Sequence, residues 1–393
     1  MLVPLFLAAC AQTAPVALAS TTADTSLAQD PLVEDEAWIR RTEGPPGAAL
    51  YLSSASLRTL HGDLDGDGVF EAPSDVDALA WFPRGGGQGP GPQDFLFSSL
   101  TNSPAYLDGD FLRLDPDGGV IVEVLESDLV QLLQPASGGF DVDALAFRPP
   151  EEFWFSLEGN LQGTVLGDLQ DGDVLVYDRA ANSIRREYTE AEIQAFVDSA
   201  LGQSGPIGDL RSLSFYPPTG EMVFTIQSPS SQDASAFGTA GGGRLLPGWG
   251  ESDWGFQQST EMDALAFVPA GIPAPPLLES SALSVAPGSL VFLNVRHGTP
   301  LFPVEGFLSL HSRFLDQPGL GAGFFFLDRR DRIFKRLVRA GRTHRQNLDA
   351  NGSLSYSFRA PQLKPSRAHL DLYFQVRELG GKGWSQPIVI RVE

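Results

Sequence analysis

The sequence predicts an all-β protein in which a small, closed, propeller-like array of four repeats precedes a C-terminal β-sandwich. Three observations predict it: the composition, four copies of a short motif, and a proline-rich boundary between an acidic and a basic part of the chain. The 393 residues include 42 Gly and 30 Pro, with 10% aromatic and 42% hydrophobic residues. This composition is typical of short strands joined by many turns, since a disordered chain would lack the aromatic residues.

Charge divides the chain into two parts. From Pro273 to the end there are 16 Lys and Arg against 9 Asp and Glu, a balance of +7, while the preceding part has 11 basic and 40 acidic residues, a balance of −29. Phosphate binding depends on Lys and Arg, so the acidic part excludes nucleic acid as its partner. It can instead collect cations, and the basic part can contact the acidic array or an anionic surface.

Residues 1–19 are expected to be a signal peptide. The run ending in Leu7-Ala-Ala-Cys10 resembles the bacterial lipobox, in which the cysteine is lipidated and becomes the first mature residue, although no Lys or Arg precedes the run. Ala17-Leu-Ala19 before Ser20 offers the alternative, an ordinary signal-peptidase site. Cys10 is the single cysteine, so the sequence predicts no disulfide and no cysteine metal site.

We therefore expect an exported protein, either extracellular or an outer-membrane lipoprotein. Its expected contact with a membrane is through a lipid anchor at Cys10 alone, because no other apolar run approaches the roughly 18 residues of a membrane span. Residues 20–48 are expected to be a linker to the repeats.

The four-unit array is expected over residues 49–270. Its first block begins at Asp75, Asp141, Asp209 and Glu261 and reads DVDALAWFP, DVDALAFRP, DLRSLSFYP and EMDALAFVP. A second block follows the first three copies, as FLFS from Phe95, FWFS from Phe153 and MVFT from Met222. A third block places DGD before a strand-like run, at Asp108–Asp110 and Asp171–Asp173.

Each unit predicts about four short strands, the number in a propeller blade. The apolar runs of the blocks are bounded by Pro and acidic turns, and further strands are expected at 120–124 and 174–177. One helix is expected from the capping-box pattern Thr189-Glu-Ala-Glu192 to about Leu201.

The ends of the array predict ring closure. The block at Glu261 lacks its second and third blocks, but Leu50-Tyr-Leu-Ser53 and Asp65-Gly-Asp67 precede the first unit. N-terminal strands could thus complete the last unit and remove the open edge, with 50–53 pairing against 263–267. The rival arrangements are an open stack and a pair of β-sandwiches.

These blocks resemble the VDAL and FS…DGD repeats of a loosely defined set of secreted bacterial proteins. The resemblance covers roughly residues 50–269. It implies that the protein is extracellular, and it implies no particular activity.

The linker Gly271-Ile-Pro-Ala-Pro-Pro276 is the clearest boundary, because proline-rich spacers extend and cannot join strand ladders. Beyond it, residues 277–393 are expected to form an immunoglobulin-like β-sandwich. Five runs predict its strands, at 290–295, 323–327, 353–358, 369–376 and 387–392, with a turn at 349–352.

Calcium is the one cofactor that the sequence suggests. Asp63-Leu-Asp65-Gly-Asp67-Gly-Val-Phe-Glu71 resembles the loop of EF-hand and dockerin-like modules, which implies a site formed by Asp63, Asp65, Asp67, Glu71 and Asp75. It departs from that pattern at position twelve, where Ser74 replaces a bidentate Glu and Asp75 comes one residue late. The alternative is an acidic β-turn, since Asp-Gly pairs are common turn formers.

The acidic residues that open the VDAL blocks have two interpretations. In a closed ring Asp75, Asp77, Asp141 and their counterparts could line an axial channel, or they could cap turns by accepting hydrogen bonds from nearby N–H groups. Arg211 breaks this acidic series and is expected to pair with a neighbour. The catalytic residues, if the protein is an enzyme, are not marked by any motif.

Two functions follow from different classes. The favoured one is a non-enzymatic binding or scaffold protein at the cell surface that contacts a glycan or a protein, because structural repetition explains residues that recur in register. The other is an extracellular hydrolase, directed at polysaccharide, that uses carboxylates at the propeller mouth.

Overall fold

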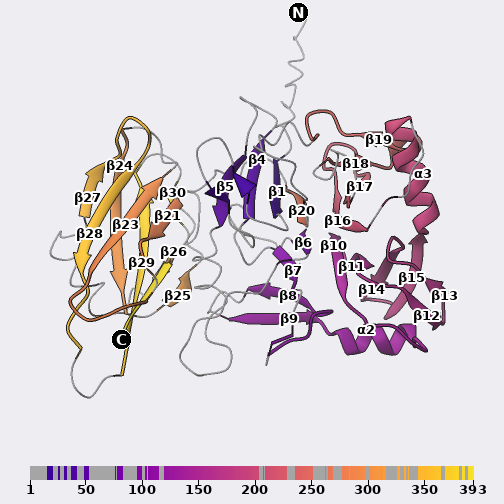
Figure 1. Ribbon diagram of the computed structural model, residues 1–393, viewed down its shortest axis with the longest axis horizontal. Coiled ribbons are helices and arrows are strands. Elements are labelled where there is room, and N and C mark those ends of the chain that lie inside the picture. Colours follow the sequence, from indigo (N-terminus) through magenta and orange to yellow (C-terminus); the bar gives the residue numbers. More distant parts are fainter. Residues whose placement is uncertain are drawn as a thin grey trace, which may run out of the picture.

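The computed structural model describes part of the chain. The described residues are 16–20, 25–26, 31–32, 37–41, 48–52, 76, 78–82, 95–99, 102–103, 105–114, 119–202, 207, 209–227, 235–250, 262, 264–268, 277–282, 284–296, 301–310, 312–315, 325–327, 332, 335, 344–363, 368–379, 383–385 and 388–393. Within this part the fold is built mainly of antiparallel sheets with few helices, as predicted (Figure 1).

Four four-stranded antiparallel sheets contain the repeats. The first sheet is β6 (Ala78–Trp81), β7 (Phe95–Ser98), β8 (Phe111–Leu114) and β9 (Val120–Val124). The second is β10 (Val142–Arg148), β11 (Glu152–Leu157), β14 (Val174–Asp178) and β15 (Ser183–Tyr188). The third is β16 (Leu210–Phe215), β17 (Met222–Ile226), β18 (Phe237–Gly238) and β19 (Arg244–Leu245).

The fourth sheet joins the two ends of the array. It is β20 (Ala264–Val268), β1 (Val16–Ser20), β4 (Ala37–Arg41) and β5 (Ala48–Leu52), in that order. N-terminal strands therefore share a sheet with the last repeat block. The expected direct pairing of 50–53 with 263–267 is wrong, because β1 and β4 lie between β5 and β20.

The structure also has strands in two segments that the sequence predicted to lie outside the array. The stretch 20–48, expected to be a linker, contains the hairpin strands β2 (Thr25–Ser26) and β3 (Pro31–Leu32) and contributes β4 to the fourth sheet. Strand β1 overlaps the last residues of the expected signal peptide and pairs from Val16 to Ser20 with β20.

The repeat blocks occupy equivalent strands. The first block supplies β6, β10, β16 and β20, and the second supplies β7, β11 and β17. The first strand of each sheet contacts the first strand of the next, since β10 contacts both β6 and β16, and β20 contacts both β16 and β6. The four first strands thus lie at the centre of the array (Figure 1).

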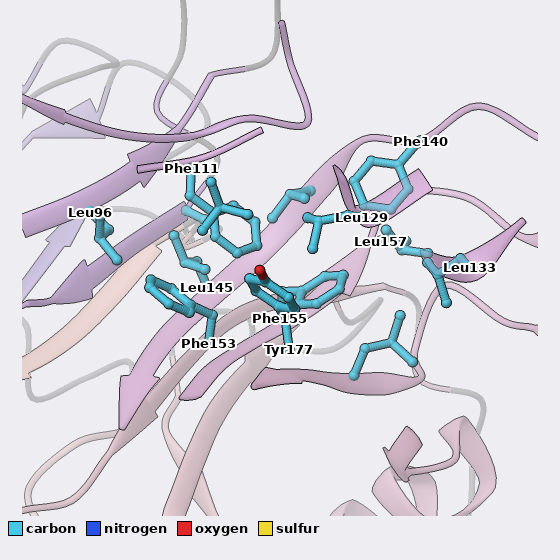
Figure 2. Packing of buried hydrophobic residues seen from close by; sticks show 14 of the residues in the cluster. Leu96, Phe111, Leu129, Leu133, Phe140, Leu145, Phe153, Phe155, Leu157 and Tyr177 are labelled. Atoms are coloured by element: carbon cyan, nitrogen blue, oxygen red, sulfur yellow. The ribbon is translucent and has the colours of Figure 1, made fainter. Parts of the chain in front are cut away.

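Successive sheets pack through shared hydrophobic clusters. In Figure 2, Phe111 of β8 lies against Phe153 and Phe155 of β11, with ring centroids 5.7 and 5.5 Å apart. A second cluster joins Trp154 and its neighbours to the third sheet, and a third cluster joins the third sheet to β20. Each fully buried large apolar side chain contributes roughly 1.5–3 kcal/mol, so these clusters hold neighbouring sheets together.

Two helices pack against the first and second of these clusters. Helix α3 (Glu190–Leu201) starts with the predicted capping box, in which Thr189 and Glu192 exchange hydrogen bonds, and it buries Ile193 and Val197. Helix α2 (Glu126–Leu133), which the sequence analysis did not predict, buries Leu129 and Leu133 in the cluster of Figure 2. Three smaller elements complete this part: β12 (Leu161–Thr164), β13 (Gly167–Leu169) and the 3-10 helix η2 (Ala240–Gly242).

The chain after the proline-rich segment forms two further sheets and a hairpin, to one side of the repeats (Figure 1). The smaller sheet is β21 (Leu277–Ser280), β23 (Leu290–Arg296) and β28 (Leu354–Arg359). The larger sheet is β22 (Ser284–Val285), β31 (Ile388–Val392), β29 (Leu370–Glu378), β24 (Pro303–Ser309) and β27 (His344–Asn347), with β30 (Gly383–Trp384) attached to β29. The hairpin is β25 (Ser312–Leu315) and β26 (Phe325–Leu327).

Both sheets contribute to one hydrophobic core. Leu278, Leu293 and Val295 of the smaller sheet share a cluster with Val376 and Ile390 of the larger one. The strands predicted from the alternating runs are present, and the turn at 349–352 is held by Asp349, whose Oδ1 accepts from the N–H groups of Asn351 and Ser353.

Candidate functional site

The residues predicted to bind calcium or lipid lie outside the described part of the chain. These are Asp63, Asp65, Asp67, Glu71 and Asp75 for calcium and Cys10 for the lipid, together with Asp77, Glu261 and Asp263 of the VDAL blocks. The described counterparts of these acidic residues lie in the first, second and third units, and they form the candidate site.

In the two DGD motifs that the structure describes, the second aspartate is buried and joins a turn to a helix. Asp110, 2% exposed, accepts from the N–H of Leu107 at 2.9 Å and from the N–H of Glu126, the first residue of α2, at 2.7 Å. Asp173, 1% exposed, makes the same two contacts with Gln170 at 3.1 Å and with Glu190, the first residue of α3, at 2.8 Å. A carboxylate at the N-terminus of a helix satisfies an otherwise unpaired N–H and lies at the positive end of the helix dipole.

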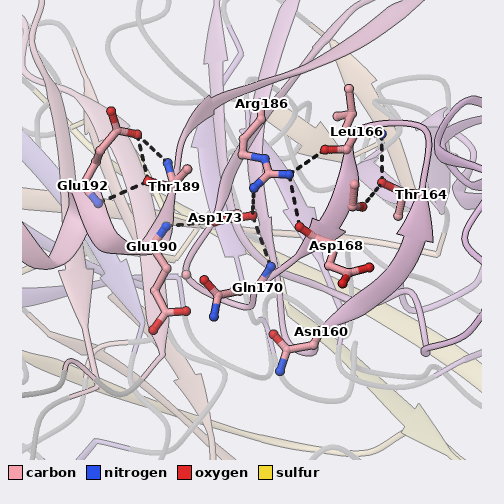
Figure 3. A network of polar contacts seen from close by, with 12 residues as sticks. Asn160, Thr164, Leu166, Asp168, Gln170, Asp173, Arg186, Thr189, Glu190 and Glu192 are labelled. Carbon is pink, nitrogen blue, oxygen red and sulfur yellow. Dashed lines mark hydrogen bonds and ion pairs between the residues drawn. The ribbon is translucent and has the colours of Figure 1, made fainter.

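Arg186 adds a third partner to Asp173 in the second unit. Figure 3 shows its guanidinium between the Asp173 carboxylate, 3.2 Å away, and the backbone carbonyls of Leu166 and Asp168. In the first unit Val122 occupies the equivalent place, since Leu112 pairs with Val122 as Leu175 pairs with Arg186. The turn is therefore the common feature, and the ion pair is an addition in one unit.

The first aspartate of these two motifs is also fixed by the turn. Asp108 and Asp171 each accept from the N–H of the following glycine at 3.1 Å, and each donates its own N–H to an asparagine side chain, Asn102 or Asn160. The glycine is required for space, because a Cβ on Gly172 would lie 2.6 Å from Cγ of Glu190.

Acidic side chains from three elements gather at the junction of successive units. At the junction of the first and second units, burial and the negative charges of Asp108 and Glu158 raise the pKa of Asp141 from 3.8 to about 7. At the same junction, burial and the negative charges of Asp108 and Asp110 raise the pKa of Glu126. At the junction of the second and third units, the pKa of Glu190 is raised by burial and then by the negative charges of Asp171, Asp173 and Asp209. Desolvation and like charges both disfavour ionisation, so these carboxyl groups hold protons at a higher pH than usual.

Arg211 pairs with aspartates of two successive VDAL-type blocks. Its Nη1 lies 2.9 Å from Oδ1 of Asp143 and 3.9 Å from Oδ2 of Asp209, which confirms that it pairs with a neighbour. Burial still raises the pKa of Asp209, although Arg211 and a hydrogen bond with Asp143 oppose that shift. Asp141 and Asp209 each accept from the N–H of the next residue at 2.8 Å, as turn-capping predicts.

The last residue of each second block links one unit to the next. Ser98 Oγ donates to the carbonyl of Val142, Ser156 Oγ to that of Leu210 and Thr225 Oγ1 to that of Met262, at 2.9, 3.3 and 3.2 Å. The three acceptors are the second residues of the following VDAL-type blocks. All three hydroxyls are fully buried, so these contacts connect neighbouring sheets away from solvent.

Glu126 and Glu190, which complete the junctions, and Arg186 were not predicted from the sequence. A signal was present, because Glu126 follows Asp110 by 16 residues and Glu190 follows Asp173 by 17. That near-constant spacing marks both glutamates as further members of the repeat.

Within the described ranges, no group of three or more His, Cys, Asp or Glu side chains is arranged to hold a metal ion. The same part of the chain contains no helix long and apolar enough to cross a membrane.

Comparisons with known proteins do not assign a family. No family matches the chain, and no curated protein matches it. Among solved structures, a fungal alcohol oxidase of the AA5 family in complex with copper aligns over 76% of the chain with 12% identity and a TM-score of 0.16, and the chain spans 51% of its length. The N-terminal domain of a Streptococcus gordonii adhesin aligns over 97% of the chain and 91% of its own length, with 8% identity and a TM-score of 0.19.

Proposed function

We propose that the protein is an exported, non-enzymatic binding or scaffold protein at the cell surface, built on a closed, propeller-like ring of four repeat units. Support for the ring comes from the contacts among β6, β10, β16 and β20, in which each first strand touches the next and β20 touches β6. The N-terminal strands β1, β4 and β5 supply the remaining strands of the fourth unit. The β-sheets after the proline-rich segment are proposed to be an immunoglobulin-like sandwich that contacts the partner.

The observation that carries the scaffold function is the structural use of the recurring residues. Ser98, Ser156 and Thr225 each donate to the next unit, and Asp110 and Asp173 each hold a helix N-terminus. The residues that recur at equivalent positions of the units thus make the same structural contact in each unit. A catalytic pair needs to occur only once, so recurrence of this kind favours a scaffold over an enzyme.

Export with lipidation at Cys10 is the proposed route to the surface. Strand β1 supports processing before Cys10, because cleavage after Ala19 would remove four of its five residues and leave β20 and β4 without the strand that joins them. A chain that starts at Cys10 keeps all of β1. Five residues then separate the lipidated cysteine from Val16, a span of at most about 20 Å, so the repeats would lie near the membrane.

The mature N-terminus tests this route. Mass spectrometry of protein isolated from bacterial membranes is expected to find a lipid-modified chain that starts at Cys10, and external protease is expected to cut it on intact cells. A Cys10→Ser variant is expected to stay unprocessed. A mature chain that starts at Ser20, or a protein inaccessible to external protease, would contradict the proposal.

Calcium at Asp63, Asp65, Asp67, Glu71 and Asp75 is proposed to stabilise the array. Three aspartates within five residues repel one another, and a divalent cation turns that repulsion into attraction. At a hundredfold excess of calcium over its dissociation constant, the expected gain in folding free energy is about 2–3 kcal/mol. Thermal unfolding with calcium and with EGTA measures it, and the shift should disappear in Asp65→Ala but persist in Asp349→Ala, which alters a turn in the C-terminal part. If wild type and Asp65→Ala have the same melting temperature with calcium and with EGTA, the loop is an acidic turn that does not bind calcium.

One observation favours the second candidate, a polysaccharide hydrolase. Burial, Asp108 and Glu158 raise the pKa of Asp141 to about 7, and a carboxyl group with a raised pKa can act as a general acid in glycoside hydrolysis. Release of reducing sugar from a panel of bacterial and plant polysaccharides, lost in Asp141→Asn, would establish the hydrolase. Absence of release by the wild-type protein across the panel agrees with the scaffold function.

A further inference from the structure

A cavity of about 370 Å³ lies between the two sheets of the C-terminal part. Its walls are apolar side chains of both sheets, including Leu278, Leu293, Leu308, Phe358, Phe374 and Val376. The volume falls in the range of about 300–1,000 Å³ that small-molecule sites occupy. Protein interiors contain few voids larger than a water molecule, so a space of this size inside a sandwich requires a physical cause.

Gly306 explains the space on the side of the larger sheet. Along β24, Val304 and Leu308 face the core, and the alternation of a strand places Gly306 on the same face between them. Its partners are His344 of β27 and Val376 of β29. A glycine at this inward position leaves empty the volume that a side chain would fill in the middle of the sheet.

The smaller sheet leaves the cavity accessible from its edge. β28 is the last strand of that sheet, and its inward residues Leu354, Tyr356 and Phe358 are half-buried, whereas their partners on β23 are buried. β27 is the last strand of the larger sheet, and Gln346, opposite the buried Val304, lines the same cavity and is exposed. The mouth therefore lies between two edge strands that are close together in Figure 1.

The lining defines the chemistry of an occupant. None of the described residues around the cavity carries a charge, and its polar groups include the amide of Gln346 and the phenol of Tyr356. Burial raises the pKa of Tyr356 to about 12, so the phenol is neutral at physiological pH. An ionised ligand would lose its hydration here without gaining an opposite charge, which disfavours it.

We propose that this cavity binds an uncharged, mainly apolar small molecule, such as a medium-chain alcohol or a small aromatic compound, with one polar group directed to the mouth beside Tyr356 and Gln346. An apolar molecule gains free energy by entering a concave site with mainly apolar walls, because binding removes apolar surface from water. The site is independent of the repeat units and of the function proposed for them.

The test is a titration of the full-length protein with the uncharged fluorescent probe N-phenyl-1-naphthylamine. The expected result is saturable binding of one probe per chain, with displacement by 1-decanol and a weaker effect of decanoate by about tenfold or more, because only decanoate is charged. Gly306→Leu fills the cavity and is expected to abolish saturable binding.

Gln346→Trp is a second variant, which blocks the mouth of the cavity with a large side chain at an exposed position. It provides an independent test if Gly306→Leu destabilises the protein. Arg345→Trp is the matched control, because it adds the same side chain to the same exposed edge strand on the opposite face. The proposal predicts loss of probe binding in Gln346→Trp and wild-type binding in Arg345→Trp. Equal binding by wild type and both tryptophan variants, non-saturable binding by wild type, or equal displacement by decanol and decanoate would overturn it.

Discussion

Asp173 is 1% exposed, and burial of a carboxyl group is unfavourable unless its oxygen atoms are hydrogen bonded. Its partners are the N–H groups of Gln170 and Glu190 and the guanidinium of Arg186 (Figure 3). The residue thus connects a turn, a helix and a strand. Its counterpart Asp110 has the two N–H partners, with Val122 in the place of the arginine.

Asp173→Asn is expected to lower the free energy of unfolding by about 3 kcal/mol, because the amide leaves a buried N–H and Arg186 without an anionic partner. Asp110→Asn is expected to cost less, about 1–2 kcal/mol, since it lacks the ion pair. Urea unfolding followed by tryptophan fluorescence measures both. Asp128→Asn, at an exposed site on α2, is the control and should change stability by less than about 0.5 kcal/mol. Equal effects of all three substitutions would rule out this role.

Asp141 makes stability depend on pH. Its pKa in the folded protein, about 7, lies above the ordinary value of 3.8, so the folded state holds this proton more tightly than the unfolded state does. The contribution is therefore fully present below about pH 4 and is lost as pH rises toward and through 7. Asp141→Asn is expected to flatten the decline of stability between pH 4 and 7, and an exposed carboxyl variant, Asp128→Asn, should keep the wild-type slope. Parallel curves for wild type and Asp141→Asn would contradict the assignment.

The strands and helices show which parts of the fold are encoded locally. The capping box of α3 was visible in the sequence because both partners, Thr189 and Glu192, lie within one turn. Helix α2 was missed because Leu125 at its start offers no capping side chain, and the N–H of Glu126 is capped by Asp110 in a distant turn. The fourth sheet shows the same limit, since N-terminal strands were predicted to complete the last unit but nothing local to Val16–Ser20 indicates that β20 is their partner.

The carboxylate junctions could be predicted only in part. The DGD and VDAL aspartates were recognised from their recurrence, and the turn-capping interpretation agrees with the hydrogen bonds of Asp141 and Asp209. Their gathering with Glu126 and Glu190 depends on how the helices start against the turns, which is a tertiary contact.

The hydroxyl contacts between units predict a graded loss of stability. Ser156→Ala removes one buried donor, and Thr225→Val removes a buried hydroxyl that also shares a hydrogen bond with Ser212. Each is expected to cost about 1–2 kcal/mol, with near-additive effects at these separate junctions. Ser183→Ala, at an exposed position of β15, is the control. Chemical denaturation of the single and double variants provides the measurement, and a cost no larger than that of Ser183→Ala would show that these hydroxyls do not join the units.

At the scale of the whole molecule, the proposed ring requires that the N-terminal strands complete the last unit. Hydrophobic clusters join the first three sheets in sequence and then join the third sheet to β20. The last contact, between β20 and β6, completes the series of first strands. β1 is the element on which this depends, because it alone links β20 to the N-terminal strands of the same sheet.

A pair of cysteines tests closure most directly. Leu18 and Ala266 are directly opposite in the β1–β20 register, so a Cys10→Ser protein carrying Leu18→Cys and Ala266→Cys is expected to form an intramolecular disulfide almost completely under mild oxidation. The matched control pairs Ala17→Cys with Ala266→Cys, which places the thiols on opposite faces of the sheet and should leave them reduced. Non-reducing electrophoresis of the monomer is the readout: a fast-migrating, cross-linked band for the first pair alone is the predicted result. Absence of that band, or the same band for both pairs, would contradict the closure of the ring by the N-terminal strand.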